Sequence, residues 1–222
     1  MLYGFSSKVV SWLCLLAVAA QTPQKPAPKG DYFPVKQGST WTYQMIIPQI
    51  GSGDVQTRTQ VVTVTKVTKD KTGTLAVLDY REDDKPAFTE KYRITANMVN
   101  RIAAGFQAGE KLVPPFPLIR FPLTVDKTWS WKGKIVQKTG AGGAEATMSV
   151  TGPEEIVVPA GKFMAYQVHC EQVLMGQLDG KPKRVSLPAD YWFAPGVGLV
   201  QRKVRFPDTI VNIQLTSFKV NH

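Results

Sequence analysis

Hydrophobic and polar side chains alternate along most of this chain, and a period of two residues is typical of half-buried β-strands. The clearest case is residues 40–47, where Trp41, Tyr43, Met45 and Ile47 fall on one face and threonine and glutamine on the other. No long amphipathic helical pattern is present. The pattern predicts an all-β fold. The other predicted strands are 56–68, 74–80, 87–94, 98–102, 128–137, 144–151, 155–158, 163–174, 185–193, 197–204 and 209–220.

One stretch of the sequence occurs twice. Residues 33–43, FPVKQGSTWTY, return as residues 121–131, FPLTVDKTWSW, at an offset of 88 (121 − 33), and the same offset places Gly73 on Gly161. Residues 112–122 carry four prolines, which cannot donate to a β-ladder and so favour an extended crossover over a central strand. We therefore predict a curved antiparallel sheet, either a half-barrel or a sandwich, built from two related halves, 31–111 and 121–222.

The first thirty residues predict export. Lys8 precedes a short apolar run, 9–20, that ends in small residues, which is the pattern of a signal peptide over residues 1–20. The run of twelve residues (9 to 20) would span roughly 18 Å as a helix, against about 30 Å of hydrocarbon. A retained anchor is the alternative, although Trp12 and Leu13 are a poor context for lipid attachment at Cys14. Residues 21–30 predict a proline-rich linker, and residues 31–222 a single β domain.

Composition and charge limit the classes of function that the sequence supports. The net charge of +10 becomes +9 without Lys8 (10 − 1), and the basic residues are dispersed along the chain. This distribution favours a solvated surface, with attraction to an anionic membrane surface as the alternative. We find no nucleic-acid-binding motif. After cleavage only Cys170 would remain, so no disulfide could form within the exported, soluble chain.

Candidate catalytic groups are few, and we predict that the protein is not an enzyme. His169 and Glu171 share the polar face of a predicted strand, while Cys170 falls on its apolar face as a small buried side chain. Adjacent carboxylates such as Glu154 and Glu155 point to opposite faces of a strand.

A metal loop is the other candidate chemistry. Asp79, Asp83 and Asp84 surround a predicted hairpin turn, but the glycine and final glutamate of a calcium loop are absent. One internal histidine and one cysteine do not supply the ligands that zinc requires. We predict no metal site and no cofactor.

Three strings resemble those of a group of exported bacterial proteins of unknown function. They are YFPVKQGSTWTY at 32–43, VPAGKFMAYQV at 158–168 and YWFAPGVGLV at 191–200, in the order in which that group carries them. Some members of the group look like half-barrels shaped like periplasmic lipoprotein carriers. The resemblance implies a curved antiparallel sheet and an exported, periplasmic or extracellular protein, and it transfers no catalytic residue.

Two functions remain open on the sequence. In the first, a concave face lined by Trp41, Tyr43, Trp129 and Trp131 binds a lipid, an acyl chain or a hydrophobic peptide. In the second, the same aromatic side chains fill the core, and the protein is a structural or partner-binding scaffold of the cell envelope.

Overall fold

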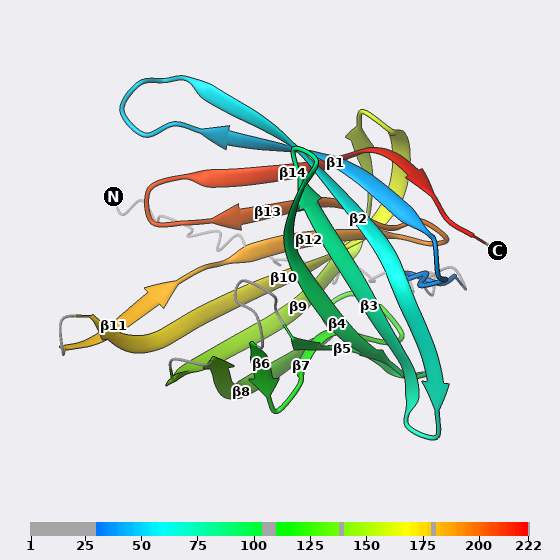
Figure 1. The fold of residues 1–222 in the computed structure, drawn as a ribbon, viewed down its shortest axis with the longest axis horizontal. Helices are drawn as coiled ribbons and strands as arrows, with labels where there is room; N and C mark the ends of the chain where they lie inside the picture. Colours follow the sequence, from blue (N-terminus) through cyan, green and yellow to red (C-terminus); the bar gives the residue numbers. More distant parts are fainter. Residues whose placement is uncertain (1–29, 104–109, 138–139, 179–180, 222) are drawn as a thin grey trace, which may run out of the picture.

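The computed structural model describes residues 30–103, 110–137, 140–178 and 181–221 (Figure 1). In these residues the chain forms fourteen strands and no helix, and therefore no helix that could cross a bilayer. The predicted signal peptide and all of the predicted linker except Gly30 lie outside the described residues. The strands are β1 (Thr40–Pro48), β2 (Val55–Asp70), β3 (Gly73–Glu82), β4 (Lys85–Ile94), β5 (Met98–Ala103), β6 (Lys111–Val113), β7 (Phe116–Arg120), β8 (Thr128–Gln137), β9 (Gly140–Val158), β10 (Gly161–Leu178), β11 (Lys181–Ser186), β12 (Ala189–Ala194), β13 (Gly198–Arg205) and β14 (Ile210–Lys219).

All fourteen strands belong to one antiparallel sheet that curves almost into a barrel (Figure 1). Its order is β6-β8-β9-β10-β12-β13-β14-β1-β2-β3-β4-β5-β7, with β11 paired to β10. The last strand, β14, pairs with the first, so the two parts of the chain meet along β14 and β1. The prediction of an all-β, curved antiparallel sheet is confirmed.

The proline-rich stretch lies at the seam of this barrel. It contributes β6 and β7, the two end strands of the sheet, which only residues 114 and 115 separate along the chain. Two tryptophans of β8 reach this stretch through their indole N–H groups. Trp129 donates to the carbonyl of Pro117 at 2.7 Å, and Trp131 donates to the carbonyl of Pro114 at 3.0 Å. Since β7 is one end strand and β8 lies next to the other, β6, Trp129 bonds across the seam between the two edges.

Apart from shifted strand ends, and from β6 and β7 in the stretch predicted as a crossover, the division into strands differs from the sequence prediction in two places. The predicted strands 144–151 and 155–158 form one long strand, β9, which pairs with β10 across a bulge. The predicted strand 185–193 is divided into β11 and β12, both paired with β10. Pro188 lies between them, and because proline has no backbone N–H it interrupts the ladder.

The turns that lead into β1 and β8 share one backbone geometry. Gly38 and Asp126 are 88 residues apart (126 − 38), and both have a positive φ, of 82° and 63°. Gly38 donates its N–H to the carbonyl of Val64 at 2.8 Å, and Asp126 donates to that of Val150 at 2.9 Å. This likeness is local. That the two halves correspond along their whole length stays a prediction.

Candidate ligand-binding cavity

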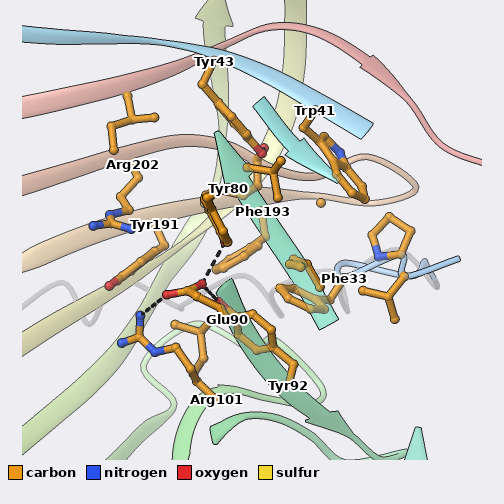
Figure 2. Close-up of a pocket in the computed structure, with 18 of the residues that line it drawn as sticks. Phe33, Trp41, Tyr43, Tyr80, Glu90, Tyr92, Arg101, Tyr191, Phe193 and Arg202 are labelled. Carbon is orange, nitrogen blue, oxygen red and sulfur yellow. Dashed lines mark hydrogen bonds and ion pairs between the residues drawn. The ribbon is translucent and has the colours of Figure 1, made fainter. Parts of the chain in front are cut away.

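A cavity of about 60 Å³ lies inside the curved sheet (Figure 2). Strands from both parts of the chain line it, together with the extended segment that precedes β1. Most of the lining is aromatic or aliphatic, with a few polar groups. The lining residues are Phe33, Pro34, Val35, Trp41, Tyr43, Gln60, Val62, Leu78, Tyr80, Glu90, Tyr92, Arg101, Leu118, Tyr191, Phe193, Gly198, Leu199, Arg202 and Ile213.

The first copy of the repeated stretch forms one wall of this cavity. Trp41 and Tyr43 alternate inward from β1, as their spacing predicts, and both are buried. Their polar atoms are bonded to the start of β13 and the turn before it: the Trp41 indole donates to the Val197 carbonyl at 2.7 Å, and the Tyr43 hydroxyl to the Leu199 carbonyl at 3.0 Å. Gly198, between these two acceptors, lies so close to Pro34 that a Cβ there would be 3.3 Å from the proline ring.

A buried carboxylate lies at the centre of the polar part. Glu90 of β4 is 4% exposed. Its Oε1 accepts from Arg101 at 3.3 Å, and its Oε2 accepts from the Tyr80 hydroxyl at 2.8 Å and from the Tyr92 hydroxyl (Figure 2). Both oxygens therefore have partners. The Arg101 guanidinium also lies over the ring of Phe116, 5.2 Å from its centre.

These contacts fix the ionisation of the cluster. Burial, and then the nearby Glu90 carboxylate, raise the pKa values of Tyr80 and Tyr92 well above the usual value, so both phenols remain protonated donors. Burial by itself would lower the pKa of Arg101, but the Glu90 carboxylate and the nearby tyrosines together outweigh burial and raise that pKa. Burial also raises the pKa of Tyr43. The cluster thus holds one carboxylate and one guanidinium, which balance each other.

Arg202 of β13 adds a second positive charge to the lining. Its guanidinium carbon lies 5.7 Å from the centre of the Tyr191 ring, and its buried Nε has no hydrogen-bond partner. Among the described residues, no carboxylate lies within ion-pair distance of Arg202. The cavity therefore carries a net positive charge.

The four aromatic residues predicted to bind a ligand fall into two places. Trp41 and Tyr43 line the cavity, while Trp129 and Trp131 are not part of its lining. The latter two are buried at the seam, where Trp131 packs edge-on against Phe116 at 5.2 Å. Any role of the four residues in binding stays a prediction.

The polar members of the cavity were missed in the sequence, although a signal was present. Glu90 lies two residues from Phe88 and from Tyr92, Arg101 two residues from Val99, and Arg202 two residues from Val200. Because side chains two apart share a face of a strand, each charge falls on an otherwise apolar face. Charged residues on an apolar face are candidates for a buried site.

The remaining candidate chemical groups lie apart from the cavity. The imidazole of His169 bridges two carboxylates, with Nδ1 2.6 Å from Asp190 and Nε2 2.8 Å from Glu171. Cys170 is buried, as predicted, and burial raises the pKa of its thiol to about 12. Neither residue lines the cavity.

The aspartates weighed as a metal loop form a hairpin tip. Asp83 and Asp84 have positive φ in the β3–β4 turn, and Asp83 accepts the backbone N–H of Thr59 at 2.9 Å. Asp79 accepts from Thr89 at 2.8 Å. Within the described part of the chain, no group of three or more histidine, cysteine or acidic residues could hold a metal ion.

Comparisons with known proteins give a fold and no family. No family model matches the sequence, and no curated protein matches it.

Solved structures do match. The chain is similar to a candidate lipoprotein from Parabacteroides distasonis, with a TM-score of 0.56 and 14% identity over 86% of this chain and 99% of that one. Two further matches have lower TM-scores. One is a candidate exported protein with a YmcC-like fold from Bacteroides fragilis (TM-score 0.45, 16% identity, 86% of this chain and 99% of that one). The other is the hypothetical lipoprotein YmcC from Escherichia coli (TM-score 0.40, 10% identity, 80% of this chain and 84% of that one). At such identities a match establishes similarity of fold alone: this chain has the fold of the Parabacteroides distasonis protein.

Proposed function

We propose that this chain is an exported, non-catalytic binding protein of the cell envelope that takes the acyl chain of a lipid into its aromatic cavity. The observation that carries the proposal is the lining itself. Apolar side chains surround a small number of convergent polar groups, which is the composition of small-molecule sites in general. A hydrophobic peptide is the other ligand that such a lining would accept.

Binding requires the cavity to open. It holds about 60 Å³, whereas ligand pockets span roughly 300–1,000 Å³. The segment Phe33–Val35 is the part of the lining that can move with least loss of backbone hydrogen bonds, because it belongs to no strand and is held by side-chain packing. Phe33 packs on the Tyr92 ring with centres 4.9 Å apart, and its N–H bonds only to nearby Asp31. Displacement of this segment would join its volume to the cavity.

Export rests on two supports. The sequence predicts a signal peptide over residues 1–20, and the similar solved structures are described as lipoproteins or as an exported protein. We propose a periplasmic or extracellular location. Mass spectrometry of the mature N-terminus tests it: a first residue near Gln21 supports cleavage, and an intact Met1 would favour a retained anchor.

Native mass spectrometry of protein purified from its own envelope tests the binding function. We expect a species heavier than the bare chain, from which lipid is released on activation. Val62→Phe fills the cavity and should remove the added mass, whereas Val61→Phe, on the other face of β2, should not. A bare mass, under conditions that preserve known lipid complexes, would contradict the proposal.

The small volume of the closed cavity favours a second candidate, a scaffold or partner-binding protein with a packed interior. Under this alternative the purified protein carries no lipid. Val62→Phe would then simply overpack the core and destabilise it by about 1–3 kcal/mol.

We further propose that one end of the molecule contacts an anionic membrane surface. Large apolar side chains at the tips of the β1–β2 and β13–β14 hairpins are exposed: Ile50, Val55, Phe206 and Ile210. The two tips are joined by a 3.1 Å bond from Thr209 to the Pro48 carbonyl, and both lie at the same end as the basic hairpin β10–β11 (Figure 1). Exposed apolar side chains close to lysine and arginine suit the interface of an anionic bilayer.

Vesicle sedimentation tests this surface. We expect binding to vesicles that contain phosphatidylglycerol and weaker binding to phosphatidylcholine alone. The double variant Ile50→Ser/Phe206→Ser should lose binding, while Met164→Ser, an exposed apolar residue of β10 in the opposite part of the molecule, should retain it. Equal binding to both kinds of vesicle would contradict an electrostatic contribution.

A further inference from the structure

The charged side chains that line the cavity do not balance: there are more positive groups than negative ones. The charged residues of the described lining are Glu90, Arg101 and Arg202. Glu90 and Arg101 form a pair at 3.3 Å, in which the side chains are 5% and 11% exposed. This leaves the guanidinium of Arg202 as an excess positive charge.

Glu90 cannot serve as the counter-ion of Arg202. One of its oxygens accepts from Arg101, and the other accepts from the hydroxyl groups of Tyr80 and Tyr92. A shift of the carboxylate toward Arg202 would break these bonds inside a buried site, where each unmade hydrogen bond costs about 1–3 kcal/mol. Any counter-ion of Arg202, which is half-buried, would therefore come from outside this cluster.

The surroundings of Arg202 leave its donors available. Within the described residues it has the Tyr191 ring as a neighbour, and its Nε, like that of Arg101, is buried without a partner. A guanidinium offers five N–H donors in a planar fork, which matches the oxygens of a carboxylate or a phosphate. Such charge-assisted bonds are roughly twice as strong as neutral ones.

The cavity also has two chemically different ends (Figure 2). Arg202, Arg101 and Tyr191 lie together on one side, while Trp41 and Phe33, the latter in the segment that precedes β1, lie on the other. An amphiphile with an acidic group would fit this polarity, with its acid at Arg202 and its chain along the aromatic wall.

We infer that the ligand of the cavity is an amphiphile with a single acidic group, a carboxylate or a phosphate, whose oxygens pair with Arg202. This inference rests on the proposed binding function and adds the charge of the ligand to it. Arg101 is a second donor within the same polar end, through its free Nε. Glu90 holds Arg101 in place, and with a singly charged ligand the charges of the occupied cavity sum to about zero.

The test uses the exported chain, stripped of bound lipid, and three probes with one chain length: dodecanoate, dodecyl phosphate and dodecanol. Binding is measured by calorimetric titration. We expect dodecanoate, dodecyl phosphate or both to bind at least about tenfold more tightly than dodecanol, because a charge-assisted hydrogen bond contributes on the order of a tenfold change or more. Which acid binds more tightly separates a fatty-acid ligand from a phospholipid ligand.

Two variants locate the acid. Arg202→Gln should remove the preference for the acids over dodecanol. Lys203→Gln is the matched control, because Lys203 is the next residue of β13, points to the other face and lies over Trp192, 5.4 Å from its ring centre. It should leave the preference unchanged. A wild-type chain that binds all three probes equally would overturn the inference while the binding function stands.

The remaining outcomes are also decisive. Failure of the wild-type chain to bind any probe would contradict the proposed function and the inference together. If Arg202→Gln does not fold, the binding of the three probes to the wild-type chain still tests the inference. A preference for the acids that is lost in high salt supports an ion pair. The absence of any preference overturns the inference. Retention of the preference in a folded Arg202→Gln chain would exclude Arg202 as the partner of the acid.

Discussion

Gly73 and Gly161 lie 88 residues apart (161 − 73) and occupy the same place in two hairpins. Each is the first residue of its strand, β3 or β10, and each pairs across a two-residue turn, with Asp70 and with Val158. Their φ angles are 123° and 129°, a region that residues with a Cβ rarely adopt. Both hairpins therefore favour glycine at this position for the same reason, which is the positive φ angle.

The two glycines differ in their surroundings, which gives a matched prediction. Gly161→Ala should destabilise the protein by about 1–3 kcal/mol through backbone strain. No steric clash adds to this cost, since nothing lies within 4 Å of the added Cβ. Gly73→Ala should cost more, since its Cβ would lie 2.4 Å from the Ile94 carbonyl oxygen. Urea unfolding measures both. Equal costs would mean that the backbone at Gly73 relaxes without loss.

The buried ion pair of Glu90 and Arg101 predicts a large loss of stability when one charge is removed. Glu90→Gln leaves the charge of Arg101 buried without its counter-ion and should destabilise the protein by about 3–5 kcal/mol. The double variant Glu90→Gln/Arg101→Met should recover part of this loss, because no unpaired charge remains. The measurement is the free energy of unfolding of each variant in denaturant.

A surface ion pair with the same N–O distance provides the control. Lys162 and Glu155 also lie 3.3 Å apart, but their side chains are 69% and 56% exposed. Glu155→Gln should therefore change the free energy of unfolding by no more than about 1 kcal/mol. Comparable losses for Glu90→Gln and Glu155→Gln would show that burial does not govern the first pair.

The thiol of Cys170 should be unreactive in the folded protein. Burial raises its pKa to about 12, so very little thiolate exists near neutral pH, and the sulfur is also covered. With an aromatic disulfide reagent at about pH 8 we expect reaction at least about a hundredfold slower than in the unfolded chain. Rapid modification of the native chain would show that β10 opens around this residue.

His169 should make stability depend on pH in a definite direction. Burial lowers its pKa, but the hydrogen bonds that its ring donates to Asp190 and Glu171, with the charges of these carboxylates, together outweigh burial, and the pKa is raised above 6.5. A raised pKa means that the folded state binds the proton more tightly than the unfolded state. The resulting stabilisation is fully present below about pH 6.5 and is lost as the pH rises through the higher, folded-state value.

The variant His169→Gln tests this dependence. We expect its loss of stability relative to the wild type to be larger at about pH 5.5 than at about pH 8.5. In the wild type Asp190 stays ionised across this window, because the hydrogen bonds and charges of His169 and Arg205 together outweigh burial and lower its pKa, and the variant keeps the 2.7 Å pair with Arg205. A loss that does not vary with pH would contradict the role of the charged imidazole.

The sequence alone determined the local features of this fold. Alternation with a period of two is a property of each strand by itself, so the inward direction of Trp41 and Tyr43 and the burial of Cys170 could be predicted without any partner strand. The turns at Gly38 and Asp126 could likewise be found by comparing the chain with itself, since backbone geometry at a turn follows from a few neighbouring residues.

Only the tertiary structure decided what each aromatic side chain does. Trp41 and Tyr43 bond to carbonyls 156 residues away and line a cavity, whereas Trp129 and Trp131 bond to carbonyls 12 and 17 residues away and close the seam. The two copies of the stretch look alike because their strands begin alike. Their roles differ because one faces β13 and the other faces the proline-rich edge.

The polar site likewise required the closed sheet. Glu90, Arg101 and Arg202 come from β4, β5 and β13, and each is a single charge in an apolar strand face. The sequence shows three such residues but not their distances. Curvature of the sheet brings them to one interior, and there the number of guanidinium groups exceeds the number of carboxylates. The excess charge, which points to an acidic ligand, is a property of that juxtaposition and not of any one segment.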